Sequence, residues 1–275
     1  MISRKIRFPK FLDKAVTLSY DDGVKQDKRL IEIMKQKGLK GTFNLGSGMT
    51  EASQNHIKLD DLYSVYGESG MEVAVHGRGH LDLQKVSVLE GVDEILSDRK
   101  NLEKIFNRVV NGMAYAFGTY NDEIIDYLKI CGIKYARTVN QTLGFSLPEN
   151  WLEWHPTCRH KEPKLMELAK SFVEGPRDNM YWRQSLKVFY LWGHSYEFDN
   201  DDNWNVIEEF ANYIGNRDDI WYATNGEIYE YIKASERLQF TADGCYVYNP
   251  SAIPVYIEDF GKFVVAEPNA TVKIK

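Results

Sequence analysis

The stretch Ala15-Val-Thr-Leu-Ser-Tyr-Asp-Asp-Gly23 decides the fold, because an apolar run leads directly into two carboxylates and a glycine. A short apolar run bounded by turn residues is typical of a buried strand, and Asp-Asp-Gly is typical of the turn that ends one. Further short apolar runs follow at 42–45, 71–75, 113–116, 134–136, 188–192 and 220–222. The chain is therefore expected to contain about seven short, buried strands.

Longer segments with apolar residues at helical spacing separate these runs, at 25–37, 86–106, 121–130 and 203–214. Strands that alternate with helices predict parallel strands joined by helical crossovers. About seven such units suit a barrel better than a small open sheet. The expected fold class is thus α/β, with a (β/α) barrel at its centre.

The pattern changes near Leu238. Four short β-like pieces follow, at 246–248, 255–257, 263–265 and 272–274, separated by turn residues such as Asn249-Pro250. They predict a small antiparallel β appendix. We expect two domains, a barrel over residues 1–237 and the appendix over residues 238–275.

Composition narrows the class of protein. Hydrophobic residues make up 43% and charged residues 27% of the chain, as in a globular protein with a full core. The net charge of −6 provides no basic field for nucleic acid or acidic lipid. The longest uncharged stretch, 244–257, is shorter than the roughly 18 apolar residues of a membrane span. Three widely separated cysteines and a charged N-terminus without a signal-peptide pattern predict a cytoplasmic protein with no membrane partner.

Polar residues follow several of the predicted strands, and these residues carry the chemistry. Asp21 and Asp22 end the first run, His76 and His80 follow the run at 71–75, and His194 follows the run at 188–192. In a βα barrel the carboxyl ends of all strands gather at one rim. Two imidazoles and one carboxylate form a three-ligand metal site with open positions, which is typical of a catalytic metal. The second carboxylate could accept a proton from water, and an imidazole opposite could protonate a leaving group. This is the layout of a hydrolase for an amide or an ester.

Three of these motifs resemble those of the NodB-type polysaccharide deacetylases, carbohydrate esterase family 4. Ser19–Gly23 is similar to the family's T-F-D-D-G motif, and Leu191–His194 to its last Leu-x-x-His motif. His76–His80 is similar to H-[ST]-x-x-H, except that Gly77 replaces the hydroxyl residue. The resemblance spans residues 15–231 and implies a distorted barrel with fewer than eight strands that binds a divalent metal, usually zinc. It implies these roles: Asp21 as general base, Asp22, His76 and His80 as metal ligands, and His194 as general acid. Cobalt, nickel and iron are also compatible with such nitrogen and oxygen ligands.

The third and fourth motifs of the family are altered here. The family's third motif begins with an arginine that holds the catalytic aspartate, whereas this chain has Ala114 at that position. Another cation should replace it, and we expect Arg137, with Arg159 as second choice. The backbone amide of Phe117 stands where the family places its donor to the oxyanion.

Several further residues are expected near the substrate. In place of the family's Asp-x-x-Asp-Trp, the segment 151–160 offers Trp154 as an aromatic wall for a sugar ring. Tyr120 and Arg159 are expected to bind substrate as well. His155 and His160 are additional candidates for the pocket. The carboxylate partner of His194 is expected among Glu153, Glu197 and Asp199.

The leading functional hypothesis is a metal-dependent de-N-acetylase that removes acetyl groups from N-acetylated sugars or oligosaccharides, a hydrolase of non-peptide C–N bonds in carbohydrate metabolism. One alternative is an amide or imide hydrolase that acts on a non-carbohydrate small molecule. A second is a carbohydrate-binding pseudoenzyme that has lost turnover with the family's arginine. An iron oxygenase also uses two histidines and a carboxylate, but the α/β rhythm argues against it. The sequence leaves the oligomeric state open, including a homo-oligomer.

Overall fold

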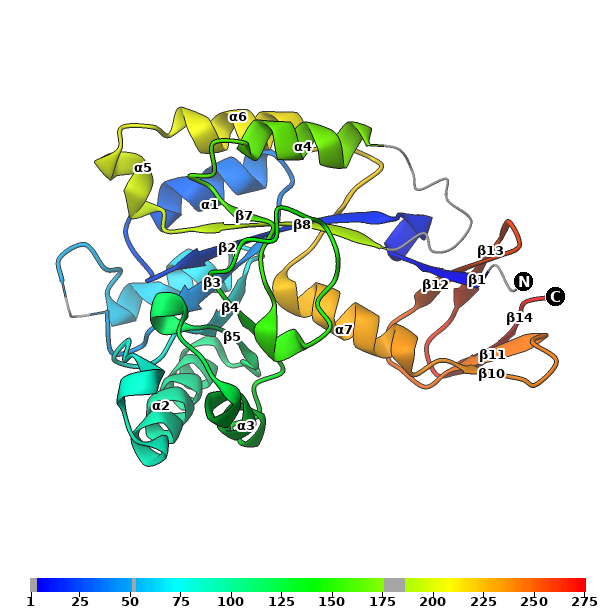
Figure 1. The fold of residues 1–275 in the computed structure, drawn as a ribbon, viewed down its shortest axis with the longest axis horizontal. Helices are drawn as coiled ribbons and strands as arrows, with labels where there is room; N and C mark the ends of the chain where they lie inside the picture. Colours follow the sequence, from blue (N-terminus) through cyan, green and yellow to red (C-terminus); the bar gives the residue numbers. More distant parts are fainter. Residues whose placement is uncertain (1–3, 51–52, 176–185) are drawn as a thin grey trace.

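The computed structural model describes residues 4–50, 53–175 and 186–275 (Figure 1). Within these residues a parallel sheet has the strand order β6-β5-β4-β3-β2-β8-β7, and β9 pairs with the beginning of β2. The strands are β2 (Lys14–Asp21), β3 (Gly41–Leu45), β4 (Glu72–Val75), β5 (Gly112–Ala114), β6 (Tyr135–Arg137), β7 (Cys158–Arg159), β8 (Lys187–Gly193) and β9 (Trp221–Tyr222). Each of the seven predicted apolar runs overlaps one of these strands. All residues of β2 are buried, as expected for a strand covered on both faces.

The segment 154–159 joins the two ends of this sheet. Trp154 exchanges backbone hydrogen bonds with the β6 side, since its N–H donates to Ala136 and its carbonyl accepts from Thr138. A few residues later, β7 pairs in parallel with β8. The sheet therefore curls into a distorted (β/α) barrel, which confirms the predicted fold class.

Helices cover the outside of the barrel. They are α1 (Asp27–Gln36), α2 (Val88–Phe106), α3 (Asp122–Ile130), α4 (Leu165–Glu174), α5 (Tyr196–Asn200), α6 (Asn205–Ile214) and α7 (Asn225–Glu236). Short single-turn helices lie at Pro9–Phe11, Leu59–Asp61, Tyr63–Gly67, Leu83–Lys85, Ala116–Gly118 and Trp151–Glu153. Figure 1 shows α1, α4 and α6 on one side of the sheet, with α2 and α3 on the other. The four predicted helical segments correspond to α1, α2, α3 and α6, whereas α4, α5 and α7 were not predicted.

Two small antiparallel sheets form the appendix at the opposite end from α5 (Figure 1). One has the order β10-β11-β14, with β10 (Gln239–Phe240), β11 (Tyr246–Asn249) and β14 (Ala270–Lys273). The other has the order β1-β12-β13, with β1 (Arg4–Arg7), β12 (Val255–Asp259) and β13 (Lys262–Ala266). The four predicted β pieces overlap strands of these sheets. The N-terminal strand β1 was not expected there, and it is held to β12 by ion pairs of Arg4 with Asp259 and of Arg7 with Glu258.

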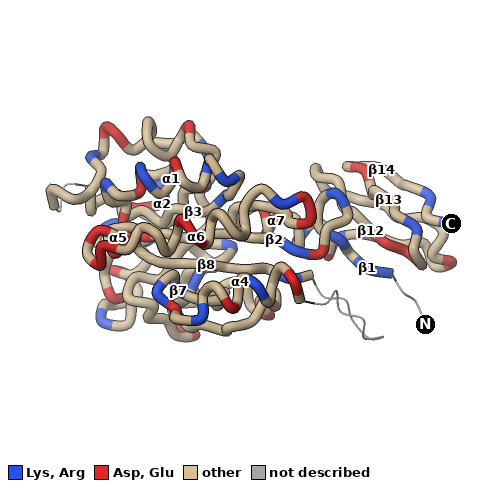
Figure 2. Tube along the Cα trace, turned by 90° about the horizontal axis from the view of Figure 1, so that it is seen from above, with Lys and Arg blue, Asp and Glu red and all other residues tan. Residues whose placement is uncertain are grey.

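The buried side chains form two clusters. The larger one fills the barrel and the space under α1 to α6. The smaller one contains Phe8, Tyr231 of α7, and Val255 and Ile257 of β12, so the appendix packs on the barrel through α7. No helix in the described part of the chain is both long and apolar enough for a membrane span. Figure 2 shows basic and acidic residues interspersed along the described chain, in keeping with the small net charge.

Candidate active site

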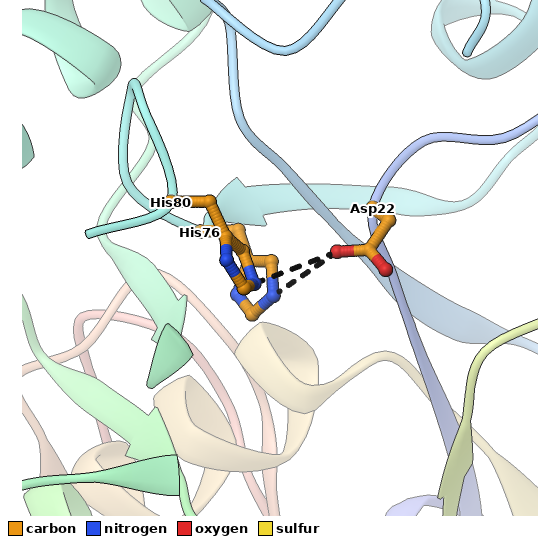
Figure 3. Close-up of side chains that lie close together, drawn as sticks. All are labelled: Asp22, His76 and His80. Atoms are coloured by element: carbon orange, nitrogen blue, oxygen red, sulfur yellow. Dashed lines mark ion pairs between the residues drawn. The ribbon is translucent and has the colours of Figure 1, made fainter. Parts of the chain in front are cut away.

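Asp22, His76 and His80 meet at the carboxyl ends of β2 and β4 (Figure 3). Their potential ligand atoms all lie within 4.8 Å of one another. The Nε2 atom of His76 is 3.5 Å from Asp22 Oδ1, and the Nε2 atom of His80 is 3.7 Å from the same oxygen. The chain takes left-handed backbone angles at both ends of this cluster, with φ +79° at Asp22 and +55° at His80. Strained backbone of this kind concentrates at functional sites.

The orientation of His76 is fixed by its second ring nitrogen. Nδ1 donates to the backbone carbonyl of Ala114 at 2.9 Å, and this bond orients Nε2 toward Asp22. Burial disfavours the imidazolium form of His76, but the nearby Asp21 and Asp22 carboxylates outweigh burial and raise its pKa. Burial likewise disfavours the Asp22 carboxylate, but the hydrogen bond with His76 and the neighbouring imidazoles lower the pKa of Asp22 well below its usual value.

Two carboxylates of α2 support the loop that carries both histidines. Asp98 is buried and accepts from the backbone N–H groups of Ser47, His76 and Gly77, while burial raises its pKa to about 6. Glu94 accepts from Gly79 N at 2.7 Å and from Leu81 N at 3.1 Å. This packing explains why residue 77 is a glycine and not a hydroxyl residue. Its φ is +88°, and a Cβ there would lie 2.8 Å from Glu94 Oε1.

Asp21 is buried beside the cluster and is held from two sides. The Nη2 group of Arg137 donates to Asp21 Oδ2, and Asn44 Nδ2 donates to Asp21 Oδ1 at 2.8 Å. The Arg137 side chain is fully buried and lies over the ring of Trp192, 4.3 Å from its centroid. The guanidinium that the altered third motif requires is therefore supplied by Arg137, the last residue of β6.

His194 follows β8 and faces both aspartates. Its Nε2 atom lies 3.9 Å from Asp21 Oδ2 and 3.9 Å from Asp22 Oδ2. Its Nδ1 atom lies 3.5 Å from Glu197 Oε2. Of the three carboxylates considered as its partner, Glu197 is thus the one in contact, since Glu153 binds Asn150 and Asp199 binds Gln26 and Trp204.

Glu197 is also in contact with three consecutive side chains at the end of β7, two of them cationic, whereas burial lowers the pKa of the third, His160. Arg159 Nη2 donates to it at 2.5 Å, Lys161 Nζ lies at 3.2 Å, and His160 Nε2 lies at 3.3 Å. Burial opposes ionisation of Glu197, but the hydrogen bonds to the histidines and Arg159 lower its pKa well below the usual range. Arg159, the second choice for Asp21, instead lies beside Glu197 and 3.4 Å from His194 Nδ1.

The remaining predicted site residues have different locations. Phe117 is 63% exposed with φ +58°, and its ring meets the His80 ring edge-on at a centroid distance of 4.6 Å. Tyr120 is partly buried and stacks on Tyr115. Trp154 requires a correction. It is 1% exposed, because it lies in the segment that closes the barrel, and its ring packs in the core. It therefore offers no face to a sugar.

The two other histidines of segment 151–160 are also away from the ligand cluster. His160 is buried, stacked on Tyr20 and packed against Phe198 beneath Glu197. His155 Nδ1 is 2.6 Å from the Thr138 hydroxyl oxygen. His160 is thus a buried neighbour of Glu197 and does not line an open pocket beside the ligand cluster.

Asp27 is a buried carboxyl that sequence reasoning missed. It accepts from the hydroxyl groups of Ser195 at 2.5 Å and Tyr66 at 2.6 Å, so it ties α1 to the residue after His194. Burial is the main cause that raises its pKa to about 7.

This raised pKa predicts a pH-dependent effect of the substitution Asp27→Asn. Between about pH 4 and pH 7 the unfolded carboxyl is ionised while the folded one keeps its proton, so the free energy of unfolding of the wild type falls as pH rises. The variant lacks this ionisation. As the pH rises from 5 to 8, the free energy of unfolding of the variant relative to that of the wild type is therefore expected to increase by about 1–3 kcal/mol. Urea unfolding at the two pH values measures this gain, and a stability difference that is the same at both would contradict it.

The donor set of Asp22, His76 and His80 fits a divalent transition metal. Each side chain presents one ligand atom to the same small volume, and His76 has its non-ligand nitrogen fixed by a carbonyl. Two imidazole nitrogens and one carboxylate oxygen suit zinc, cobalt, nickel or iron(II). With three protein ligands, open positions remain for water and substrate.

Comparisons with known proteins agree with this fold. Residues 9–136 match the model of a family described as polysaccharide deacetylase. No curated protein sequence matches the chain. A Mycobacterium smegmatis structure assigned to the polysaccharide deacetylases is 16% identical, with a TM-score of 0.60 over 83% of this chain and 93% of its own. The wild-type carbohydrate esterase family 4 pseudoenzyme of Bacillus anthracis is 15% identical, with a TM-score of 0.51 over 82% of this chain and 67% of its own.

A deacetylase from Streptococcus pyogenes, solved in complex with acetate, is 25% identical over 50% of this chain, with a TM-score of 0.46. The match spans 61% of the streptococcal chain, less than two thirds of its length. The match of residues 9–136 to the family model confirms the resemblance indicated by the strand-end motifs, and the structural likenesses show the shared fold.

Proposed function

We propose that this chain, whose residues 9–136 match the polysaccharide deacetylase family model, is a metal-dependent hydrolase that removes acetyl groups from N-acetylated sugars or oligosaccharides. The observation that carries the proposal is the position of Asp21. It is a buried carboxylate held by Arg137 and Asn44, directly beside three side chains that could hold a metal and opposite an imidazole.

Asp22, His76 and His80 are the residues that would hold the metal. When bound, a divalent cation supplies a Lewis acid that acidifies water and polarises the acetyl carbonyl oxygen. Asp21 accepts the proton of the attacking water, because its carboxylate lies beside the ligand cluster and is held there by Arg137. Arg137 and Asn44 each hold one carboxylate oxygen, so the side chain cannot rotate away from the cluster.

His194 donates a proton to the amide nitrogen that leaves with the sugar. Its Nδ1 atom lies 3.5 Å from Glu197 Oε2, and this contact orients the ring with Nε2 toward Asp21 and Asp22. Arg159 and Lys161 in turn hold Glu197. We assign the backbone amide of Phe117 to the oxyanion that forms at the carbonyl, and the exposed Phe117 ring to contact with substrate beside His80. Tyr120 and Arg159 stay proposed substrate contacts at the edge of the site.

A second candidate function is hydrolysis of an amide or imide in a non-carbohydrate small molecule. One observation favours it: the aromatic wall predicted at Trp154 is part of the core, so the described site has fewer aromatic faces for a sugar than expected. The pseudoenzyme alternative rested on the lost arginine, and the contact of Arg137 with Asp21 removes that reason.

The proposal is tested by measuring acetate release from N-acetylglucosamine oligomers after loading with zinc or cobalt. We expect about one bound metal per chain and acetate release that stops when a chelator removes the metal. Acetate release from simple amides but not from sugars would favour the second candidate. Sugar binding without acetate release, with metal bound, would favour the pseudoenzyme.

A further inference from the structure

We propose that Ser195 and Asp27 are positioning residues that hold His194 in place for its proton transfer. The inference rests on the proposed function, because it assigns a support to one step of that reaction. It starts from two side chains that the reaction itself does not use. Ser195 and Asp27 are fully buried, and the Ser195 hydroxyl donates to Asp27 Oδ1 at 2.5 Å.

The contacts that orient the ring of His194 are long. Its nearest polar contacts in the described part of the chain join Nδ1 to Arg159 Nη2 at 3.4 Å and to Glu197 Oε2 at 3.5 Å. The rings of Tyr196 and Trp192 lie at centroid distances of 5.2 and 5.8 Å, and 19% of the His194 side chain is exposed. The location of Nε2 therefore depends on how firmly the backbone of residue 194 is held.

The hydroxyl of Ser195 holds this backbone from the next residue. Ser195 directly precedes α5, where a serine hydroxyl commonly caps the helix that it begins. Here the hydroxyl forms no cap, and it is directed to Asp27 instead. Glu197 N donates to His194 O at 3.1 Å, so the turn that starts with His194 is attached to Asp27 through a single short hydrogen bond.

Asp27 is a firm anchor because it is itself tied to two other segments of the rim. It is the first residue of α1, and its backbone N–H donates at 3.0 Å to the carbonyl of Val24, two residues after Asp22. Its second carboxyl oxygen accepts from the hydroxyl of Tyr66 at 2.6 Å, and Tyr66 is fully buried. Asp27 thus connects the turn of His194 to the loop of Asp22 and to the segment after β3.

A carboxyl group suits this junction, since it offers two acceptor oxygens to two hydroxyl donors. No basic side chain within residues 4–50, 53–175 and 186–275 forms an ion pair with Asp27. Its contribution is therefore the two hydrogen bonds. Of these, only the bond from Ser195 reaches the segment that carries His194.

Loss of this bond would affect the proton transfer and not substrate binding. A general acid must have its donor atom within hydrogen-bond reach of the leaving nitrogen. A displacement of about 1 Å can lower the rate by about 100-fold. The substrate contacts proposed at Phe117 and Tyr120 belong to the segment after β5, which the bond between Ser195 and Asp27 does not touch.

The test compares the variant Ser195→Ala with the wild-type, zinc-loaded enzyme on two substrates. For N-acetylglucosamine oligomers, kcat is expected to fall at least about 10-fold while KM stays within about 2-fold. For 4-nitrophenyl acetate, the rate is expected to change less than about 2-fold, because nitrophenolate leaves without a proton from an acid. A variant that merely loosened the fold would slow both reactions alike. Equal losses on the two substrates, or no loss on the oligomers, would overturn the proposal.

Ser251→Ala is the matched control, because it makes the same change at another buried serine. The Ser251 hydroxyl donates to Asn249 Oδ1 at 2.6 Å, between β11 and β12 of the appendix. This control is expected to leave both reactions unchanged, and a loss equal to that of Ser195→Ala would contradict the positioning role. If Ser195→Ala does not fold, Ser195→Cys replaces it, since a thiol is a weaker donor on a side chain of similar shape. The same selective loss on the oligomers is expected.

A measurement of ring motion separates this inference from the proposed function. Carbon-13 relaxation of the His194 Cε1–H bond, identified by its absence in His194→Gln, reports the order parameter of the ring without turnover. The order parameter is expected to fall in Ser195→Ala and to stay unchanged in Ser251→Ala. This result supports the positioning role even if the wild type releases no acetate. An unchanged order parameter in Ser195→Ala overturns the inference while leaving the deacetylase proposal intact.

Discussion

Asp21→Asn is expected to lower the rate of acetate release by about 10²–10⁴-fold while the protein keeps its bound metal. The amide has nearly the same shape as the carboxylate, but it cannot accept the proton of the attacking water. The ligand atoms of Asp22, His76 and His80 are unchanged by the substitution. Acetate release and metal content per chain, measured on the same preparation, check both parts of the expectation.

A loss of stability accompanies this variant, because it removes the negative charge beside the buried Arg137. Breaking a buried ion pair typically costs about 3–5 kcal/mol. The introduced amide retains an oxygen that can still accept from Arg137, so the loss is expected to be smaller than that. Urea unfolding measures it and confirms that the variant is folded under assay conditions. Activity close to that of the wild type would contradict the assignment of Asp21 as the base.

Asp22→Asn is expected to have a different effect, although it makes the same chemical change one residue further along. Here the substitution removes the anionic ligand, so metal affinity is expected to fall by at least about 100-fold, and activity with it. His76→Ala should behave in the same way. Excess zinc or cobalt is expected to restore part of the activity of Asp22→Asn, whereas it should restore none to Asp21→Asn.

The free energy of unfolding distinguishes the variants Asp21→Asn and Asp22→Asn without a measurement of turnover. A metal at 100 times its Kd stabilises the folded state by about 2.7 kcal/mol. Addition of zinc should therefore raise the free energy of unfolding of the wild type and of Asp21→Asn, but not that of Asp22→Asn at the same concentration. Equal stabilisation of both variants would show that Asp22 is not a ligand.

The strands and the ligand cluster could be predicted because both follow from local patterns. Each predicted apolar run is a strand of the barrel, and parallel strands bring their carboxyl ends to one rim without further information. The placement of Asp22, His76 and His80 needs only this geometry, so residues more than 50 positions apart were expected together.

The support of the site was harder to predict, because it depends on contacts between distant segments. The choice between Arg137 and Arg159 for Asp21 is decided by the path of β6 into the barrel. The burial of Trp154 depends on the short segment that closes the sheet, which has too few residues for a recognisable pattern. The positions of Glu94 and Asp98 in the sequence could have indicated their supporting role. They lie on the face of α2 that also holds Ile95 and Leu102, and acidic residues on the apolar face of a helix need donors elsewhere.

The antiparallel pairing of β1 with β12 has a consequence for biosynthesis. Arg4 and its partner Asp259 are 255 residues apart, so the ribosome needs about 13–50 s to produce the second after the first. During that time Ile6 and Phe8, which pack in the smaller cluster of the finished protein, have no sheet to join. The nascent chain therefore carries β1 as an unpaired strand until β12 has been made.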